Sequence, residues 1–548
     1  MGKFVISILF SLIFALPASA VPIKASKIMI SAHCPYATEA AIKIAEAGGN
    51  PIDVALTAML TMAVTNPSFG SLGGGGFALV KMGEKVEALD FREVAPKAMG
   101  PDYYTKKAEN ASTVGGTAVG VPGLPAGIQE LHKKYGKIHW SRLFDAPIRL
   151  AQKGFRVTGG WVKDTTQSSK KFNPAARRFF LKKNGKPYKP GEIMKQPQLA
   201  KALKEMRNRK TTSFYNGRIG RDIVNSVKKA GGHMTLADLK AYKPKWRKPA
   251  VETFEGHQIY LMPPPSSGAA VIQTALRLVS PLKIANEKPR GAGELHALAE
   301  ALKLSFRGRM LLGDPDFHTN PTEKLLSNKY IDSLADKYDD DNASELEPLN
   351  LKKLAEEATE TSHLSVINNK GQAVSITITV NGLYGSKMAT DRYGIVMNNQ
   401  MDDFNTKPGQ PNKFGLIQGQ GNLVEAGKRP LSSMSPTIVE KDDVAVIALG
   451  GRGGPRIISS VFQVLYRLLV RGDDIDTAIQ TARVHHQFLP NRILIDTART
   501  SPEVIDELND RDHKVEDGWQ GRIYGVMNKN GVLEGAFDSR REGSARGF

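Results

Sequence analysis

The sequence predicts a globular fold of mixed α and β structure, and three observations support this. Helical and extended hydrophobic patterns alternate along the first half of the chain, and a pattern typical of a β-hairpin begins at Thr361. The 548 residues include 41% apolar and 24% charged residues, the proportions of a globular protein. A chain of this length can bury a sizeable core, in one large domain or in several ordinary ones.

Helical spacing defines the expected elements in chain order. The first helix spans Ala37–Ala47 and ends at a Gly-Gly-Asn run, and the second spans Ile52–Val64 and is stopped by Asn-Pro. A glycine run at Gly73–Gly76 leads into a short strand at Phe77–Val80, and we interpret these glycines as closely packed backbone. Further helices are expected at Leu124–Tyr135, Trp140–Gln152, Arg218–Lys229, Ala269–Val279, Glu294–Arg309 and Ile457–Val470.

The region before Thr361 differs from the region after it. Tyr338–Thr359 is acidic and polar, which is typical of a linker. The pattern then becomes that of two strands, Thr361–Ile367 and Gln372–Val380, around a turn at Asn368–Gly371.

This hairpin permits a geometric prediction. If the turn centres on Lys370, Thr361 lies opposite Thr379, with the two side chains about 5 Å apart on one face. Asn381 then lies one diagonal step further along the same face. A slip of one residue would send these side chains to opposite faces, and Thr377 would take the place of Thr379.

Residues 1–20 have the pattern of a cleaved secretion signal. Lys3 gives a positive start, Phe4–Leu16 is an uncharged run that is apolar apart from Ser7 and Ser11, and Ala18–Ala20 offers the small residues of a cleavage site. The apolar run is too short for a membrane anchor, which needs about 20 residues. We therefore expect an exported protein, periplasmic or secreted, with no stable membrane anchor. The single cysteine, Cys34, has no partner within the chain for a disulfide.

The net charge of +20 raises the question of a polyanionic partner. Part of the excess lies between Lys163 and Lys189, amid Pro and Gly, and we interpret this segment as a solvated surface excursion. No nucleic-acid-binding motif accompanies it, so nucleic acid is not an expected partner. The His485-His486 pair has no second pair at ligand spacing, which favours packing on a helix over a metal site.

Six motifs occur in an order and spacing that resemble one family. They are Gly73–Phe77, Asp90–Glu93, Thr361–Ser365, Asn398–Phe404, Lys428–Pro436 and Gly450–Gly454. Together they resemble the large and small subunits of γ-glutamyltransferases, over nearly the whole chain after residue 20. Several motifs in the right order are more specific than any one of them.

The resemblance implies a fold and a processing event. The fold is the four-layer αββα sandwich of N-terminal-nucleophile hydrolases, of α+β class. An inactive precursor cleaves itself between Glu360 and Thr361, giving a large subunit of residues 21–360 and a small catalytic subunit of residues 361–548 that associate as a heterodimer. The implied substrates are glutathione-like γ-glutamyl compounds, with water or amino acids as acceptors. Neither a metal nor an organic cofactor is implied.

The resemblance makes Thr361 the nucleophile, where the residue alone would suggest only a strand opening with a β-branched side chain. A threonine hydroxyl is a poor nucleophile without a neighbouring base, and a freed α-amine with a pKa of about 7.7 to 8.0 can accept its proton. Thr379 is expected to hydrogen-bond the Thr361 hydroxyl and hold its rotamer. The alternative for Thr379 is an ordinary strand threonine.

The glycines Gly453 and Gly454 precede a helix. Their backbone amides, near the positive end of the helix dipole, can stabilise the oxyanion of a tetrahedral intermediate. Phosphate binding is the alternative for such a loop, but no Gly-Lys-Ser/Thr ending follows either glycine run.

A γ-glutamyl group presents an α-ammonium and an α-carboxylate, so a specific site must offer both signs of charge. By resemblance, Asp403, Gln400 and Asn381 receive the ammonium. Arg92, Ser432 and Ser433 receive the carboxylate, and a guanidinium with hydroxyl donors suits that group. Taken singly, each has an ordinary alternative, such as an exposed arginine, a surface turn or the start of a loop.

Three positions depart from the family pattern. The loop Asn405–Gly427 resembles a lid over the substrate, but Phe414 stands where some members have a tyrosine, so no hydroxyl tethers the lid to Asn381. Closure is then expected to be looser, which favours hydrolysis over transfer. Arg452 adds charge beside the glycine loop, and Phe537–Arg540 is a blurred form of the family's tail.

Two rival functions remain open at this point. The first is a related glutaryl or cephalosporin acylase, whose substrate lacks the ammonium, so Asp403 and Gln400 argue against it. The second is a non-enzymatic basic protein that binds the cell envelope and keeps the fold.

Overall fold

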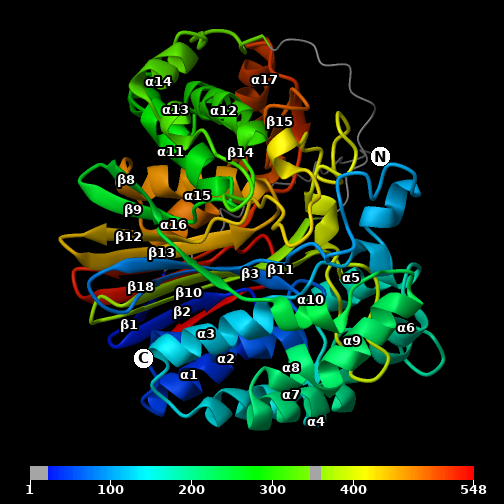
Figure 1. Cartoon of the computed structure of the whole chain (residues 1–548). Coiled ribbons are helices and arrows are strands. Elements are labelled where there is room, and N and C mark those ends of the chain that lie inside the picture. The colour runs from blue at the N-terminus through cyan, green and yellow to red at the C-terminus, as the bar shows by residue number, and fades with distance from the viewer. Residues whose placement is uncertain (1–21, 346–358) are drawn as a thin grey trace, which may run out of the picture.

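Two seven-stranded sheets pack face to face, and helices cover both outer faces, as Figure 1 shows. This computed structural model describes residues 22–345 and 359–548. The expected signal at residues 1–20 and most of the expected linker, 346–358, lie outside the described residues. The αββα sandwich that the resemblance implied is confirmed.

Sheet I, as we call it, holds the hairpin at its centre and is buried on both faces. Its strands, in spatial order, are β19 (Ser544–Gly547), β2 (Ile28–Ala32), β10 (Thr359–Asn368), β11 (Ala373–Gly382), β3 (Gly75–Lys81), β4 (Val86–Phe91) and β7 (Lys245–Arg247). All neighbouring strands are antiparallel.

Sheet II packs against the inner face of sheet I, mainly through β13 and β17. Its strands, in spatial order, are β1 (Ile23–Ala25), β18 (Val532–Phe537), β17 (Arg522–Lys529), β13 (Val444–Arg452), β12 (Thr437–Lys441), β9 (His257–Leu261) and β8 (Ala250–Phe254). Two small sheets lie outside the sandwich, β14 (Val484–His485) with β15 (Ile493–Ile495) and β16 (Val515–Asp517), and β5 (Phe155–Arg156) with β6 (Ile193–Met194).

The helices on the outer face of sheet I surround α2, whose residues are all buried. A helix that is apolar all round belongs in a core, and its start is fixed by a capping box between Asn50 and Asp53. The helices of this layer are α1 (Pro35–Glu46), α2 (Pro51–Thr65), α3 (Leu124–Tyr135), α4 (Asp145–Lys153), α5 (Gly159–Ser169), α6 (Pro174–Phe180), α7 (Pro197–Arg209), α8 (Thr212–Asn216), α9 (Arg218–Lys229) and α10 (Leu236–Ala241).

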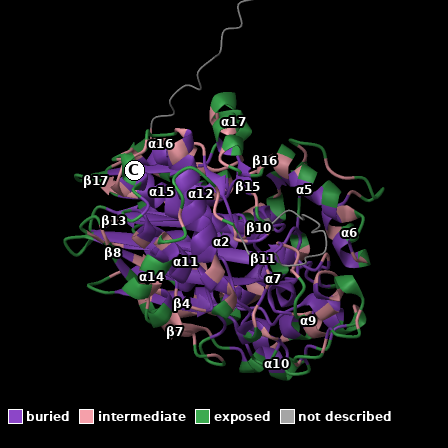
Figure 2. Ribbon diagram, turned by 90° about the horizontal axis from the view of Figure 1, so that it is seen from above, coloured by how far each residue is buried: buried purple, intermediate pink, exposed green. Residues whose placement is uncertain are grey.

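The helices over sheet II form the opposite layer, and α12 and α15 are buried at its centre, as Figure 2 shows. They are α11 (Gly268–Leu278), α12 (Ala292–Phe306), α13 (Thr322–Leu325), α14 (Asn328–Ala335), α15 (Arg456–Leu469), α16 (Ile475–Gln480) and α17 (Pro502–Asp510). Within the described ranges, no helix combines the length and the apolar character that crossing a membrane requires.

The expected helices are present, with two differences at their ends. Trp140–Phe144 and Arg307–Leu311 are 3₁₀ turns that precede α4 and follow α12. The expectation of a helix at His485-His486 is wrong, because His485 ends the short strand β14, although both imidazoles are buried in packing contacts. Among the described residues, no group of three or more His, Cys, Asp or Glu side chains is arranged to hold a metal ion.

The basic segment between Lys163 and Lys189 contains more structure than expected. It includes most of α5 and all of α6. Phe172, between the two helices, and Ala176 and Phe180 of α6 are buried. Its basic side chains still project into solvent, as the composition indicated. The exposed ones include Lys170, Lys171, Arg177, Arg178, Lys183, Lys186 and Lys189.

The hairpin has the predicted register. Thr361 pairs with Thr379, and the following pairs continue in step down to the turn. Asn368 holds the turn by accepting two backbone N–H bonds on its side-chain oxygen, and Gly371 adopts φ 72°, a conformation that suits glycine. Thr361 therefore lies on the inner face of sheet I.

The inner face of the hairpin is polar, although it lies between two sheets. His363 lies 2.9 Å from both the Thr377 and the Ser365 hydroxyls, and burial lowers its pKa to about 3, so the ring is neutral. A Cβ at Gly450 would come within 2.3 Å of this ring. The absence of a side chain at Gly450 of β13 therefore leaves space for His363, which lies on the same face of β10 as Thr361.

Candidate active site

One pocket opens where the end of the hairpin meets the glycine loop and the 405–427 loop. Nine of the ten residues predicted to act in catalysis or substrate binding line it, and Gly453 does not. The nine are Arg92, Thr361, Thr379, Asn381, Gln400, Asp403, Ser432, Ser433 and Gly454. Six other residues complete the lining, namely Arg309, Phe414, Leu416, Leu431, Met434 and Ile457.

The nucleophile end of the pocket is built on the hairpin. Thr361 and Thr379 face each other across the ladder, with 5% and 3% of their surfaces exposed. The Thr379 hydroxyl accepts the Asn381 N–H at 2.8 Å, and Asn381 adopts φ 75°. This turn of the backbone ends the strand beside the pocket. The hydrogen bond expected between the two threonine hydroxyls stays a prediction.

The glycine loop joins β13 to α15 and lies against the nucleophile end. Gly453 and Gly454 adopt φ values of 133° and 56°, which side chains with a Cβ rarely adopt. Neither amide N–H donates a hydrogen bond to any residue in the described parts of the chain. Of the two glycines, Gly454 lines the pocket. The oxyanion role of the two amides stays a prediction.

Arg452 does not extend its charge into this pocket. Its guanidinium donates to His33 Nε2 at 2.7 Å and lies 4.1 Å from the centre of the Phe69 ring. His33 Nδ1 lies 3.3 Å from the Ser362 hydroxyl, on the strand that carries Thr361. Burial lowers the pKa of His33 well below its usual value, and the charge of Arg452 lowers it further. Arg452 therefore does not line the pocket but contacts, through His33, the strand that carries Thr361.

The recognition end of the pocket is built from charged groups on loops. Arg92 donates to Asp403 at 2.5 Å, and Gln400 donates to the same carboxylate oxygen at 2.6 Å. Arg92 is 1% exposed and Asp403 is 8% exposed, so the alternatives of an exposed arginine and a surface turn do not apply. The two groups expected to bind opposite ends of a zwitterion are paired with each other.

Ser432 and Ser433 also line the recognition end, and two backbone hydrogen bonds hold Ser432. The Ser432 N–H donates to the Pro265 carbonyl at 2.7 Å, and its carbonyl accepts the Ser267 N–H at 2.8 Å. The serine pair therefore belongs to an ordered bridge, and both residues are buried. The sequence motif that contains them also supplies the Leu431 carbonyl, which accepts from Arg92 at 3.4 Å.

Glu93 lies directly behind Arg92 with none of its surface exposed. Burial raises the pKa of this carboxyl to about 8, although Arg92, 3.8 Å away, opposes the shift. The group is therefore mainly protonated at neutral pH. Its neutral form leaves Arg92 free to interact with Asp403 or with a ligand.

Arg309 is a pocket residue that the sequence did not identify. It follows α12 in the 3₁₀ turn Arg307–Leu311, and it is 3% exposed. Its Nη1 donates to the side chain of Gln418 in the 405–427 loop at 3.0 Å. The hydrophobic pattern treated it as the last residue of a helix, and no local motif marks it, because only the contact between the turn and the loop brings it into the pocket.

The 405–427 loop lies over the pocket and has several attachments. Phe414 and Leu416 contribute to the lining, and the Phe414 carbonyl accepts from Gln487 at 3.0 Å. The Gln418 amide donates to the Asp403 carbonyl at 3.3 Å. The loop is thus held over the charged end even though Phe414 lacks a hydroxyl. Whether its closure is looser, as expected, stays a prediction.

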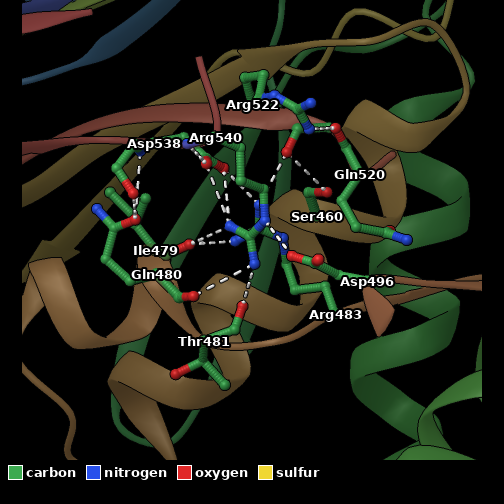
Figure 3. Close-up of polar contacts among 12 residues, drawn as sticks. Ser460, Ile479, Gln480, Thr481, Arg483, Asp496, Gln520, Arg522, Asp538 and Arg540 are labelled. Carbon is green, nitrogen blue, oxygen red and sulfur yellow. Dashed lines mark hydrogen bonds and ion pairs between the residues drawn. The ribbon is translucent and has the colours of Figure 1, made fainter. Parts of the chain in front are cut away.

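The unusual tail lies outside the pocket and closes the end of sheet II. Asp538 is buried and accepts from Arg483 at 2.5 Å and from Arg540 at 3.1 Å, as Figure 3 shows. Burial raises the pKa of Asp538, but the surrounding arginines outweigh it and hold the pKa below the usual value. Arg540 continues the network to Asp496 at 2.6 Å. The tail therefore has a structural role.

Comparison with known proteins identifies the family. The family model described as Gamma-glutamyltranspeptidase matches residues 37–548. The chain belongs to the γ-glutamyltranspeptidase family. A glutathione hydrolase proenzyme of Escherichia coli is 35% identical over 530 residues, covering 95% of this chain and 91% of that protein. A glutathione hydrolase proenzyme of Pseudomonas aeruginosa is 36% identical over 530 residues, covering 94% of this chain and 93% of that protein.

Solved structures agree on the fold of this γ-glutamyltranspeptidase family member. A cephalosporin acylase from Bacillus halodurans superposes with a TM-score of 0.85 and covers 99% of both chains at 22% identity. At this level of identity the similarity concerns the αββα architecture and not the substrate.

Proposed function

We propose that this chain is a self-processing γ-glutamyltransferase with glutathione hydrolase activity and that Thr361 is its nucleophile. Membership of the γ-glutamyltranspeptidase family supports the activity, and the names of the two relatives support a glutathione hydrolase made as a proenzyme. The observation that carries the proposal is the pocket itself, because it joins a pair of strand hydroxyls to a buried ion pair of opposite charges.

The first step is cleavage of the bond between Glu360 and Thr361. In the precursor, the nitrogen of Thr361 is an amide and cannot take up a proton. The hydroxyl attacks the preceding carbonyl, an ester forms, and water resolves the ester into a carboxylate and a new N-terminal threonine. The freed α-amine, with a pKa of about 7.7 to 8.0, is then a base beside the hydroxyl. The products are a large subunit, 21–360, and a small subunit, 361–548, which remain associated as a heterodimer.

The second step transfers the γ-glutamyl group. The Thr361 oxygen attacks the γ-carbonyl carbon, and its proton passes to the α-amine. The amides of Gly453 and Gly454 stabilise the oxyanion, the carbon–nitrogen bond breaks, and the leaving amine takes the proton. Water or an amino-acid amine then attacks the acyl-enzyme ester and restores the hydroxyl. Thr379 holds the hydroxyl in position throughout.

Substrate recognition exchanges one ion pair for two. The α-ammonium binds Asp403, with Gln400 and Asn381, and the α-carboxylate binds Arg92, with Ser432 and Ser433. Both charges of the Arg92–Asp403 pair are then still compensated, so the zwitterion does not leave a buried charge unpaired. A glutathione-like donor fits this description.

Export belongs to the same proposal. Residues 1–20 act as a secretion signal and are removed, which places the enzyme in the periplasm or outside the cell. N-terminal sequencing of the purified protein is expected to find two starts, one at Val21 and one at Thr361. A single start at Met1 would contradict both the export and the cleavage.

The decisive experiment replaces the nucleophile. Thr361→Ala is expected to remain a single chain on a denaturing gel and to lose glutathione hydrolysis. Thr253→Ala, on the exposed edge strand β8, is the matched control and is expected to be cut and active. Cleavage or hydrolysis by Thr361→Ala at the wild-type rate would remove Thr361 from both steps.

A further inference from the structure

The small sheet of β5 and β6 presents an exposed apolar side chain. Ile193 of β6 is 52% exposed, the largest exposed fraction among the large apolar side chains of the described residues. Arg156 of β5 lies directly across the ladder from it and is exposed as well, whereas the next pair, Phe155 and Met194, is buried. Because side chains alternate along strands, Ile193 and Arg156 project together into solvent.

The backbone on both sides of Ile193 is ordered. The Val157 N–H donates to the Glu192 carbonyl at 2.9 Å, and the Gln196 N–H donates to the Ala151 carbonyl at 2.8 Å. The side chain is therefore held outward by a paired strand, and its exposure does not result from a frayed chain end.

The chain around this small sheet carries half of the protein's excess charge. Residues 153–195 contain twelve Lys and Arg but only two acids, Asp164 and Glu192, which gives a net charge of +10 against +20 for the whole chain. Asp164 is buried and accepts from Arg541 at 2.5 Å. Glu192 accepts from the Lys182 ammonium at 2.6 Å. Both acids are thus already engaged, and the cations of this stretch greatly exceed its carboxylates.

Several of these cations gather around Ile193. A Cβ at Gly154 would lie 2.5 Å from the Ile193 side chain and 3.0 Å from that of Lys195, so the end of α4 is close to both. The Lys182–Glu192 ion pair brings the turn that follows α6 to the same place. We call Ile193 and the exposed basic residues of these segments the basic face; its cations are Lys153, Arg156, Lys183, Lys186, Lys189 and Lys195. Like charges repel one another, so an anionic partner would relieve this repulsion.

The chemistry of the basic face matches an anionic lipid surface better than the other polyanions. An apolar side chain among cations on flexible stems is typical of proteins that bind at the membrane interface, where lysines meet lipid phosphates and the apolar group enters the acyl boundary. Nucleic acid offers phosphates but no apolar layer for Ile193. A protein partner would need a much larger apolar contact area than one side chain provides.

From these observations we infer that the basic face docks the protein reversibly on anionic lipid bilayers, with Ile193 inserted among the headgroups. Figures 1 and 2 show α5 and α6, which lie between β5 and β6 in the chain, at the periphery of the molecule. None of the residues of the basic face lines the pocket. Docking and catalysis can therefore be measured separately, and the inference does not depend on the proposed function.

The first test measures sedimentation of the purified protein with lipid vesicles. At low salt, we expect the protein to bind vesicles of phosphatidylcholine mixed with phosphatidylglycerol and to leave vesicles of pure phosphatidylcholine unbound. Binding should be lost at about 1 M salt, where charges are screened beyond about 3 Å. Equal sedimentation with the two kinds of vesicle, or no sedimentation with either, would overturn the inference.

Two triple variants separate the basic face from the net charge of the protein. Replacing Lys183, Lys186 and Lys189 by Gln is expected to weaken binding to the anionic vesicles about 100-fold, since each lysine near such a surface contributes about fivefold. The matched control replaces three exposed lysines of the helical layer over sheet II by Gln, namely Lys288, Lys324 and Lys337. It removes the same charge and is expected to change binding by less than about threefold. An equal loss in both variants would mean that net charge alone attracts the vesicles, and the inference would be wrong.

A single substitution tests the apolar contact. Ile193→Ser is expected to weaken vesicle binding about tenfold, because the serine gains little on leaving water. Val532→Ser, at another exposed apolar position, on β18, is the matched control and should bind like the wild type. Thermal unfolding of each variant checks that it is folded. If double-stranded DNA binds as tightly as the anionic vesicles and Ile193→Ser weakens neither, the basic face is a general polyanion surface and the inference is wrong.

Discussion

The two ends of the pocket are lined by different kinds of chemical group. The nucleophile end consists of neutral hydroxyls and backbone amides on paired strands and a helix start. The recognition end consists of buried charges on loops and turns, held by one another and by the 405–427 loop. The first end is fixed by sheet register, whereas the second depends on an electrostatic balance. Substitutions at the two ends should therefore change different measured quantities.

The largest expected effect is at the recognition end. Asp403→Ala leaves Arg92 buried without its counter-charge, and such losses are worth about 3 to 5 kcal/mol. We expect kcat/KM for γ-glutamyl-p-nitroanilide to fall about a hundredfold to several thousandfold, while cleavage at Thr361 continues. Asp332→Asn, exposed on α14, is the control for the loss of one carboxylate. Loss of cleavage in Asp403→Ala would show that the two ends are not independent.

The next effect concerns the pH dependence of stability. The pKa of Glu93 is raised from 4.5 to about 8, so the folded protein holds a proton that the unfolded chain releases above pH 4.5. This contribution is complete below the unfolded pKa and is lost as pH rises through about 8. Urea unfolding of wild type and Glu93→Gln from pH 4.5 to 8.5 should show a steeper decline for the wild type, by a few kcal/mol in total. Parallel curves would rule out a protonated Glu93.

A smaller effect is expected at the nucleophile end. Thr379→Val keeps the shape of the side chain but removes the hydroxyl that accepts the Asn381 N–H. One neutral hydrogen bond is worth about 1 kcal/mol, so we expect kcat to fall about tenfold or less, with KM for the γ-glutamyl donor little changed. A change confined to KM would assign Thr379 to substrate binding instead.

The smallest effect is expected at the loop that covers both ends. Phe414→Tyr adds a hydroxyl in a lining position shared with Asn381, and a weak hydrogen bond there is worth about 0.5 kcal/mol. We expect the ratio of transfer to hydrolysis, measured with an amino-acid acceptor, to rise about twofold. An unchanged ratio would mean that the Arg309–Gln418 and Gln487–Phe414 bonds already hold the loop.

The nucleophile end could be anticipated from the sequence because its geometry is local. A turn centred on Lys370 is enough to place Thr361 opposite Thr379, since side chains alternate along strands and the pairing follows the turn. The layered fold was available only through the resemblance. Hydrophobic periodicity predicted the helices well but placed His485 on a helix. His485 lies instead on the short strand β14, which forms because it pairs with β15, a distant contact that local sequence spacing does not reveal.

The recognition end could be anticipated only in part. Its motif residues were named, but their pairing with each other was not, because it depends on the approach of Arg92 after β4 to the turn at Asp403. Arg309 was missed for the same reason. Arg452 was expected to add charge near the oxyanion site, yet its side chain turns to His33 and Phe69, a direction that no local pattern encodes.

The order of the strands has a consequence for the life of the protein after it cuts itself. In sheet I, β2 lies between β19 and β10, the strand that contains Thr361, and β3 lies beside β11, so strands from the two sides of the cleavage site pair with each other. In sheet II, β1 pairs with β18 and β9 pairs with β12 in the same way. After cleavage, each sheet would contain strands from both fragments, so the fragments could separate only if both sheets lost their pairing. The proposed hydrolysis before Thr361 is irreversible, and its chemical result would be to convert one amide nitrogen into an amine.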